Sequence, residues 1–102
     1  MDKLNKKYPL TIGIPTYNRP NEVDRLLKSV VPQLTPEVEI LIRDDSPDER
    51  TAEVVKKHFP KPSDQVVYSH GERLGIDGGE LYVVEHGRGD YVWTFGDDDE
   101  MA

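Results

Sequence analysis

Four short apolar runs divide the chain, at residues 10–14, 38–42, 66–68 and 91–95. Each run is rich in the β-branched and aromatic residues that favour strands. The second run is apolar at nearly every position, which is typical of a strand covered on both faces. The last run, which combines aromatic and β-branched residues, is likewise predicted to be a buried strand.

The segments between these runs show helical spacing. The clearest case follows the first strand, where apolar residues at spacings of three and four form one face: Val23, Leu26, Leu27, Val30, Val31 and Leu34. Asn21 is predicted to cap this helix, and Pro32 to end or kink it. Two further helices are predicted at 49–59 and 80–86, with the inward-facing residues Ala52, Val55, Phe59, Leu81 and Val84.

Strands and helices therefore alternate along the chain. This order predicts an α/β fold, Rossmann-like, with three α/β/α layers and a mainly parallel sheet. The 102 residues are enough for one domain with a modest core. In such sheets ligands bind outside the carboxyl ends of the strands.

Polar residues follow three of the predicted strands, at positions 15–18, 44–46 and 97–99. The carboxyl ends of parallel strands lie along one edge, so we expect these residues to line one crevice. The acids at 97–100 come directly after the aromatic strand. Hard carboxylate oxygens suit Mg²⁺ or Mn²⁺, which proteins often hold with one or two carboxylates and a substrate phosphate.

Each of these stretches also has a purely structural explanation. The terminal acids fit a solvated charge run, and the stretch at 44–48 fits an Asx turn with a helix cap. The stretch at 16–18 fits an ordinary connector. Arg73 fits either an exposed loop arginine or a partner for a phosphate or carboxylate.

The overall charge excludes some partners. There are 20 acidic residues against 13 Lys and Arg, which leaves a net charge of -7. A nucleic-acid backbone requires a net basic face, so no nucleic-acid partner is expected. The chain contains no cysteine, no apolar signal segment and no membrane-length apolar run, and a cytoplasmic location is expected.

Three motifs resemble the family 2 glycosyltransferases, which have the GT-A fold. Residues 11–19 look like the opening of that family, residues 39–48 match its second motif, and residues 89–99 resemble its aspartate-x-aspartate motif. The form of the last motif is nearest to the branch with abequosyltransferase-like enzymes. The three motifs stand in order over nearly the whole chain, and residues 1–102 are expected to form the nucleotide-sugar-binding half of the GT-A fold.

The resemblance implies a nucleotide-diphospho-sugar donor, with Pro15, Thr16 and Tyr17 by the nucleotide, Asp45 near the base and Asp98 near the ribose. Mn²⁺ or Mg²⁺ on the diphosphate would be held by Asp99 and Asp97. The nucleotide-sugar-binding residues predicted in this way are Pro15, Thr16, Tyr17, Arg19, Asp44, Asp45, Arg73 and Asp98.

The resemblance also implies transfer of the sugar to a hydroxyl of a saccharide or other acceptor with inversion, assisted by a carboxylate base. No residue of this chain is assigned as that base, which is expected beyond Ala102 together with the acceptor half, so this fragment alone is expected to be inactive. Many relatives carry an Arg-Asn pair where Glu80 and Leu81 stand here, and Asp77 is a candidate replacement.

Two other interpretations compete with a glycosyltransferase. The first is a non-catalytic nucleotide- or metal-binding α/β module. The second is a receiver-like signalling domain, which also places acids after a strand but requires a phosphoacceptor Asp after its middle strand. Here that strand ends in Ser69 and His70, which argues against a receiver. A half-domain exposes sheet edge and apolar faces, so self-association is expected.

Overall fold

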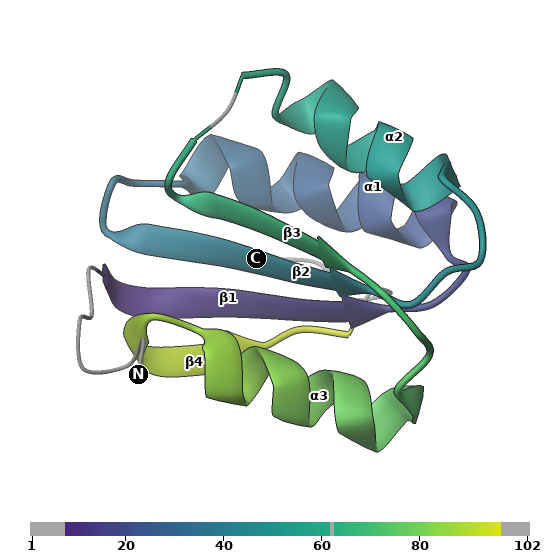
Figure 1. The fold of residues 1–102 in the computed structure, drawn as a ribbon. Helices are drawn as coiled ribbons and strands as arrows, with labels where there is room; N and C mark the ends of the chain where they lie inside the picture. The colour runs from purple at the N-terminus through teal and green to yellow at the C-terminus, as the bar shows by residue number, and fades with distance from the viewer. Residues whose placement is uncertain (1–7, 62, 97–102) are drawn as a thin grey trace.

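The computed structural model describes residues 8–61 and 63–96, apart from the side chains of residues 76 and 77. Within this part, four parallel strands form one sheet in the order β3-β2-β1-β4, with helices on both faces (Figure 1). The predicted Rossmann-like α/β fold is confirmed. The elements are β1 (Tyr8–Thr16), α1 (Pro20–Val30), η2 (Val31–Gln33), β2 (Val38–Asp44), α2 (Arg50–His58), β3 (Val66–His70), α3 (Gly75–His86) and β4 (Gly89–Thr94).

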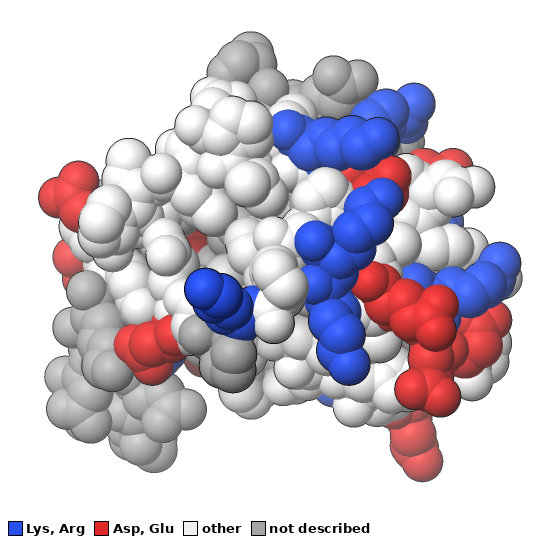
Figure 2. Space-filling model, turned by 90° about the horizontal axis from the view of Figure 1, so that it is seen from above, with Lys and Arg blue, Asp and Glu red and all other residues white. Residues whose placement is uncertain are grey.

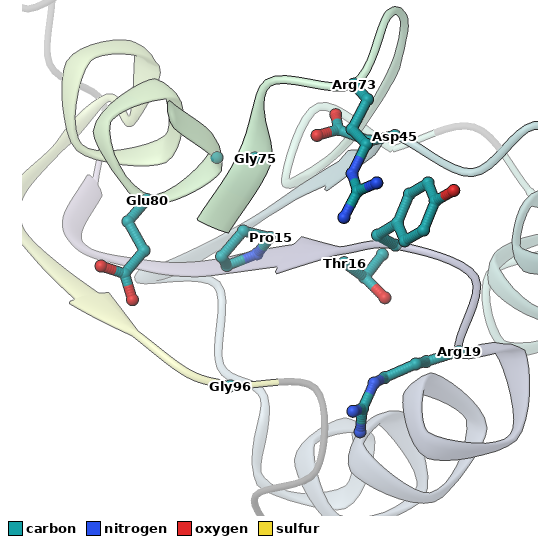
Figure 3. Close-up of a pocket in the computed structure, with 10 residues that line it drawn as sticks. Pro15, Thr16, Arg19, Asp45, Arg73, Gly75, Glu80 and Gly96 are labelled. Atoms are coloured by element: carbon teal, nitrogen blue, oxygen red, sulfur yellow. The ribbon is translucent and has the colours of Figure 1, made fainter. Parts of the chain in front are cut away.

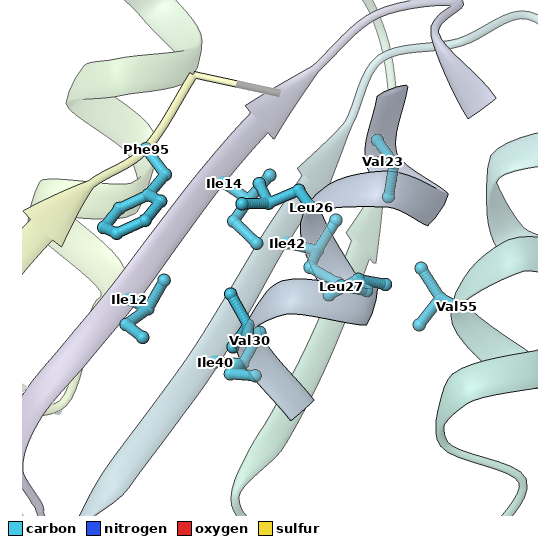
Figure 4. Packing of buried hydrophobic residues seen from close by; sticks show 10 residues of the cluster. All are labelled: Ile12, Ile14, Val23, Leu26, Leu27, Val30, Ile40, Ile42, Val55 and Phe95. Atoms are coloured by element: carbon cyan, nitrogen blue, oxygen red, sulfur yellow. The ribbon is translucent and has the colours of Figure 1, made fainter. Parts of the chain in front are cut away.

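The main core lies between the sheet and α1, the helix with the clearest sequence periodicity. Its predicted inward residues Val23, Leu26, Leu27 and Val30 are fully buried. They pack with isoleucines of β1 and β2 and with Val55 of α2 (Figure 4). Burial of each such side chain contributes about 1.5–3 kcal/mol. This packing fixes β1 and β2 at the centre of the sheet.

The start of α1 differs from the prediction. The helix begins at Pro20 and not after Asn21, and Arg19 occupies the N-cap position without a side-chain cap. Proline suits the first helical position because its fixed φ is helical and its missing N–H would have no helical partner there. At the other end, Pro32 lies in η2, a short 3-10 turn that continues directly from α1.

Helix α3 covers the opposite face of the sheet, and two predictions about it are wrong (Figure 1). It begins at Gly75, five residues before the predicted start at Glu80. It buries Val83, whereas the predicted inward residues Leu81 and Val84 are exposed. The reason is close packing on β1, where a Cβ on Gly13 would lie 2.8 Å from the Val83 side chain.

Strand β4 is an edge strand, which overturns its predicted burial. Tyr91 is 77% exposed and Trp93 51% exposed, and only Phe95, just past the strand, reaches the core. Pairing with β1 alone leaves one side of β4 open among the described residues. At Gly89 the strands approach so closely that a Cβ would lie 2.4 Å from the Thr11 backbone nitrogen.

A buried carboxylate joins three strands at their amino-terminal ends. Glu39 on β2 is 1% exposed and accepts hydrogen bonds from Thr11 Oγ1 at 2.8 Å and from the Arg88 backbone N–H at 2.9 Å. The Arg88 side chain donates to it from Nε at 2.5 Å, and the Gly89 N–H donates to Thr11 Oγ1 at 2.8 Å. This Glu39 network ties β2, β1 and the start of β4 together.

Charges of both signs mix on the surface over α1 and α2. There Lys and Arg side chains lie beside Asp and Glu side chains (Figure 2). Asp24 of α1, for example, pairs with Lys28 at 3.6 Å and with Lys57 of α2 at 3.0 Å. None of the helices in the described residues has the length and apolar character needed to cross a bilayer.

Candidate functional site

A pocket of about 390 Å³ opens at the carboxyl edge of the sheet (Figure 3). β1 and β2 end there side by side, with Thr16 paired to Asp44. The chain leaving β4 reaches the same edge, because the Phe95 N–H donates to the Gly13 carbonyl at 2.9 Å. The pocket is lined by Pro15, Thr16, Tyr17, Arg19, Asp45, Arg73, Gly75, Gly79, Glu80 and Gly96.

The pocket brings together residues that are far apart in the sequence. The predicted binding residues among its lining are Pro15, Thr16, Tyr17, Arg19, Asp45 and Arg73. They come from the end of β1, the start of α1, the end of β2 and the loop before α3. The ends of β1 and β2 therefore share one crevice, but of the described residues expected there only Pro15, Thr16, Tyr17 and Asp45 line it, and Asn18, Asp44 and Ser46 do not.

Asp44 is a predicted binding residue that does not line this pocket. It is fully buried, and its carboxylate accepts hydrogen bonds from Tyr68 Oη at 2.5 Å and from the Ser46 N–H at 2.9 Å. Burial, and then the hydrogen bond and charge of Asp44, raise the pKa of Tyr68 above its ordinary value. In this structure the Asp44 carboxylate joins β2 to β3 below the loop at 45–46.

Asp45, unlike Asp44, lines the pocket, although its side chain is mostly buried. Its Oδ1 accepts a hydrogen bond from Arg43 Nε at 2.9 Å, and its Oδ2 accepts one from the Leu74 N–H at 2.8 Å. Each carboxylate oxygen has a second lone pair, so Asp45 can still accept a hydrogen bond from a ligand. Its carboxylate is therefore an oriented acceptor in the pocket wall.

Tyr17 and Arg73 form an exposed pair at the mouth of the pocket. The Arg73 guanidinium lies 4.1 Å from the centroid of the Tyr17 ring, within the range of a cation–π interaction. Together they present a flat aromatic surface and a positive charge, while Arg19 lines the pocket from the start of α1. A ligand with both a planar ring and negative charge suits these walls.

The turn after β1 is held in place by the loop after β2. The Asp45 N–H donates to the Thr16 carbonyl at 3.0 Å, and the Asn18 N–H donates to Ser46 Oγ at 2.7 Å. Asn18 has a φ of 57°, a left-handed conformation that asparagine tolerates better than most residues. Arg50 of α2 also donates to the Asn18 side-chain oxygen. These contacts fix the position of Tyr17 between them.

Sequence reasoning missed part of the pocket wall, namely Gly75, Gly79, Glu80 and Gly96. The available signal was the cluster of glycines at 75, 78 and 79, because glycine permits close approach. A Cβ on Gly79, for instance, would lie 3.0 Å from the Pro15 Cβ. Glu80 adds a carboxylate to the wall formed by α3, where it points toward the chain beyond β4 (Figure 3).

The acids of the predicted metal site, Asp97 and Asp99, lie outside the described residues, as does Asp98. The Asp77 side chain is also not described. The described residues alone contain no group of three His, Cys, Asp or Glu side chains suited to a metal ion. Gly96, the last described residue, lines the pocket directly before the acids begin.

The known proteins that this chain resembles in sequence are named as glycosyltransferases. The profile of the family described as "Glycosyl transferase family 2" matches residues 11–102. Abequosyltransferase RfbV of Salmonella typhimurium is 34% identical over 96 residues, which cover 91% of this chain and 29% of that protein. A Campylobacter jejuni enzyme named GalNAc(5)-diNAcBac-PP-undecaprenol beta-1,3-glucosyltransferase is 28% identical over 94 residues, which cover 90% of this chain and 30% of that protein. The chain thus spans less than a third of these relatives.

Two solved structures superpose on most of this chain. TarS of S. aureus (residues 1–349), in complex with UDP, superposes with a TM-score of 0.75 at 27% identity, over 89% of this chain and 28% of that one. The mannosyltransferase PcManGT of Pyrobaculum calidifontis, in complex with GDP-Man and Mn²⁺, gives a TM-score of 0.77 at 19% identity, over 96% of this chain and 32% of that one. At 19% identity, the likeness to PcManGT shows the shared fold alone.

Proposed function

Because this chain belongs to glycosyl transferase family 2, we propose that its pocket binds the nucleotide-diphospho-sugar donor of a glycosyltransferase. The whole protein would transfer the sugar to a hydroxyl of a saccharide or other acceptor. The observation that carries the proposal is the gathering of Tyr17, Asp45 and Arg73 in one pocket at the carboxyl edge of the sheet. These side chains offer an aromatic face, an oriented acceptor and a cation, which match a base and a diphosphate.

In this proposal each residue has a chemical task. The Tyr17 ring stacks on the base, and Asp45 accepts a hydrogen bond from an N–H of the base. Arg73, whose guanidinium already lies on the Tyr17 ring, contributes positive charge beside the bound nucleotide. Asp98 is proposed to bind the ribose. UDP in the TarS complex is a nucleotide of this chemical class.

Mn²⁺ or Mg²⁺ is the proposed cofactor, held by Asp97 and Asp99. Their hard carboxylate oxygens fit these ions, and they follow Gly96, which lines the pocket. A divalent ion bound there supplies positive charge to the diphosphate as a Lewis acid. The pocket wall supports this assignment, because Glu80 makes part of it acidic and a bridging cation would relieve repulsion from an anionic donor.

We further propose that transfer inverts the anomeric carbon by direct displacement. None of the described pocket residues is assigned as the base that activates the acceptor hydroxyl. The predicted cytoplasmic location and self-association both stay predictions.

Calorimetric titration tests the proposed function. UDP-, GDP-, CDP- and dTDP-sugars would be titrated into this chain with and without MnCl₂. We expect one nucleotide class to bind, and to bind more tightly with the metal. Asp99→Ala should abolish the metal dependence, and Glu100→Ala, which removes the same charge one residue later, should keep it. Absence of binding by every nucleotide sugar would refute the proposed function.

A further inference from the structure

Arg43 lies directly behind the pocket and contacts three chain segments with one guanidinium. Its Nε donates to Asp45 Oδ1 at 2.9 Å, at the end of β2. Its Nη1 donates to Ser69 Oγ at 3.1 Å on β3, and its Nη2 donates to the Glu72 carbonyl at 3.0 Å in the loop before α3. The Arg43 side chain is only 10% exposed, so these contacts are largely shielded from water.

Helix α3 and the loop before it complete the enclosure of this guanidinium. The Tyr82 ring of α3 lies under it, with its centroid 4.6 Å from the Arg43 Cζ, and the Tyr82 hydroxyl hydrogen-bonds Ser69 Oγ at 2.8 Å. Gly71 leaves the necessary room, because a Cβ there would lie 2.7 Å from Arg43 Nη2. We name Arg43 with Asp45, Ser69, Glu72 and Tyr82 the Arg43 clamp.

The clamp fixes the orientation of the pocket acceptor. One oxygen of Asp45 is bound by Arg43 and the other by the Leu74 N–H, so the carboxylate cannot rotate without breaking one of the two bonds. The same loop, held through the Glu72 carbonyl, carries Arg73 into the pocket wall. The relative position of the acceptor and of Arg73 therefore depends on a residue that does not line the pocket.

We propose that Arg43 is a positioning residue for base recognition, an inference that rests on the proposed function. It holds the Asp45 carboxylate and the loop at 71–74 in the arrangement that one nucleobase requires. A planar guanidinium can donate in three directions at once, whereas a lysine ammonium cannot reproduce this fork. Loss of the clamp should thus weaken the choice between bases more than it weakens binding of the diphosphate.

The first test measures the clamp without any ligand. Amide hydrogen exchange by NMR is compared at Leu74, which donates to Asp45, and at Ser46, which donates to the neighbouring Asp44. In Arg43→Lys we expect exchange at Leu74 to rise at least tenfold and exchange at Ser46 to stay unchanged. A general loss of stability would raise both rates. Unchanged exchange at Leu74 would overturn the clamp.

The second test measures base preference. Dissociation constants for UDP, CDP, GDP and dTDP, each with MnCl₂, are compared between the wild type and Arg43→Lys. A charged hydrogen bond that is correctly directed is worth roughly a factor of ten in affinity. We expect the ratio between the best and the second-best nucleotide to fall by about tenfold. A ratio that is retained while Leu74 exchange rises would overturn the role in base recognition.

Two further variants provide an independent disruption of the clamp and a control. Gly71→Ala displaces the guanidinium while it retains every charge, and should reproduce both effects even if Arg43 variants fold poorly. Arg25→Gln, which changes an exposed arginine of α1, is the control and should change neither measurement. If the wild type binds no nucleotide, the proposed function fails and the role in base recognition falls with it, while the exchange result still decides whether the clamp exists.

Discussion

Removal of the Glu39 carboxylate is the most demanding test of how this fold is held together. Glu39→Ala leaves the Arg88 guanidinium and two hydrogen-bond donors without their buried acceptor. Breaking a buried ion pair by deletion of one partner typically costs about 3–5 kcal/mol. Arg88 is 21% exposed and keeps both a hydrogen bond to the Asp64 carbonyl at 2.6 Å and an ion pair with the Asp64 carboxylate at 3.5 Å. We therefore expect the lower value, about 3 kcal/mol.

That loss is large against the stability of a small domain, which is of the order of 5–15 kcal/mol. Urea unfolding followed by circular dichroism measures it, with an unchanged dependence on denaturant as evidence of two-state behaviour. Asp48→Asn is the control, because Asp48 and Arg50 form a solvent-exposed pair at 3.1 Å whose removal should leave the unfolding curve nearly unchanged.

A double variant tests whether the charge of Arg88 causes this loss of stability. The double variant Glu39→Met, Arg88→Met removes both charges of the buried pair and leaves only the Thr11 hydroxyl and the Arg88 N–H without their acceptor. Hydrophobic replacement of a whole ion pair is often neutral or stabilising. We expect the double variant to recover at least half of the lost stability. A cost below about 1 kcal/mol for Glu39→Ala, or no recovery in the double variant, would refute the argument that Arg88, deprived of its buried carboxylate, is the main source of the cost.

Two other predictions concern α1 and α3. Hydrogen bonds from Lys57 and His58 lower the pKa of Asp24 to about 2. These contacts should stabilise the fold fully above the ordinary pKa near 4, by only about 1 kcal/mol because water screens the exposed Lys57. That contribution should be lost as the pH falls toward 2, and acid unfolding of Asp24→Asn should lack this component. Val83→Ala should lower the free energy of unfolding, measured in urea, by about 2 kcal/mol, whereas Leu81→Ala should lower it by less than about 0.5 kcal/mol. The reverse order would show that α3 packs by its predicted face.

The elements that depend on local pattern were predictable from sequence. The face of α1 follows from the spacing of Val23, Leu26 and Leu27, and all three are fully buried. The shared crevice followed from parallel topology, since the carboxyl ends of neighbouring strands must meet at one edge. Each of these inferences used only the period of a helix or the direction of a strand.

The features that were predicted wrongly, or could not be predicted, depend on contacts between distant segments. Whether Trp93 is buried depends on strand order, and β4 lies at the edge of the described sheet. Asp44 and Asp45 could not be separated by residue type, and only the structure shows that Asp45 lines the pocket while Asp44 binds the Tyr68 hydroxyl. The start of α3 at Gly75 depended on close packing that a run of glycines permits but does not specify.

The Glu39 network lies at the amino-terminal end of the strands, while the pocket lies at their carboxyl end. Glu39 and Asp44 are five residues apart on β2, a separation of roughly 17 Å at the rise of a strand. At that separation two unit charges interact by only about 1 kcal/mol at the effective dielectric constant of a protein. Substitutions that alter the charge of the pocket wall should therefore leave this anchor intact. Because the pocket and the Glu39 network lie at opposite ends of the strands, new ligand preferences can evolve in the pocket without a compensating change in that network.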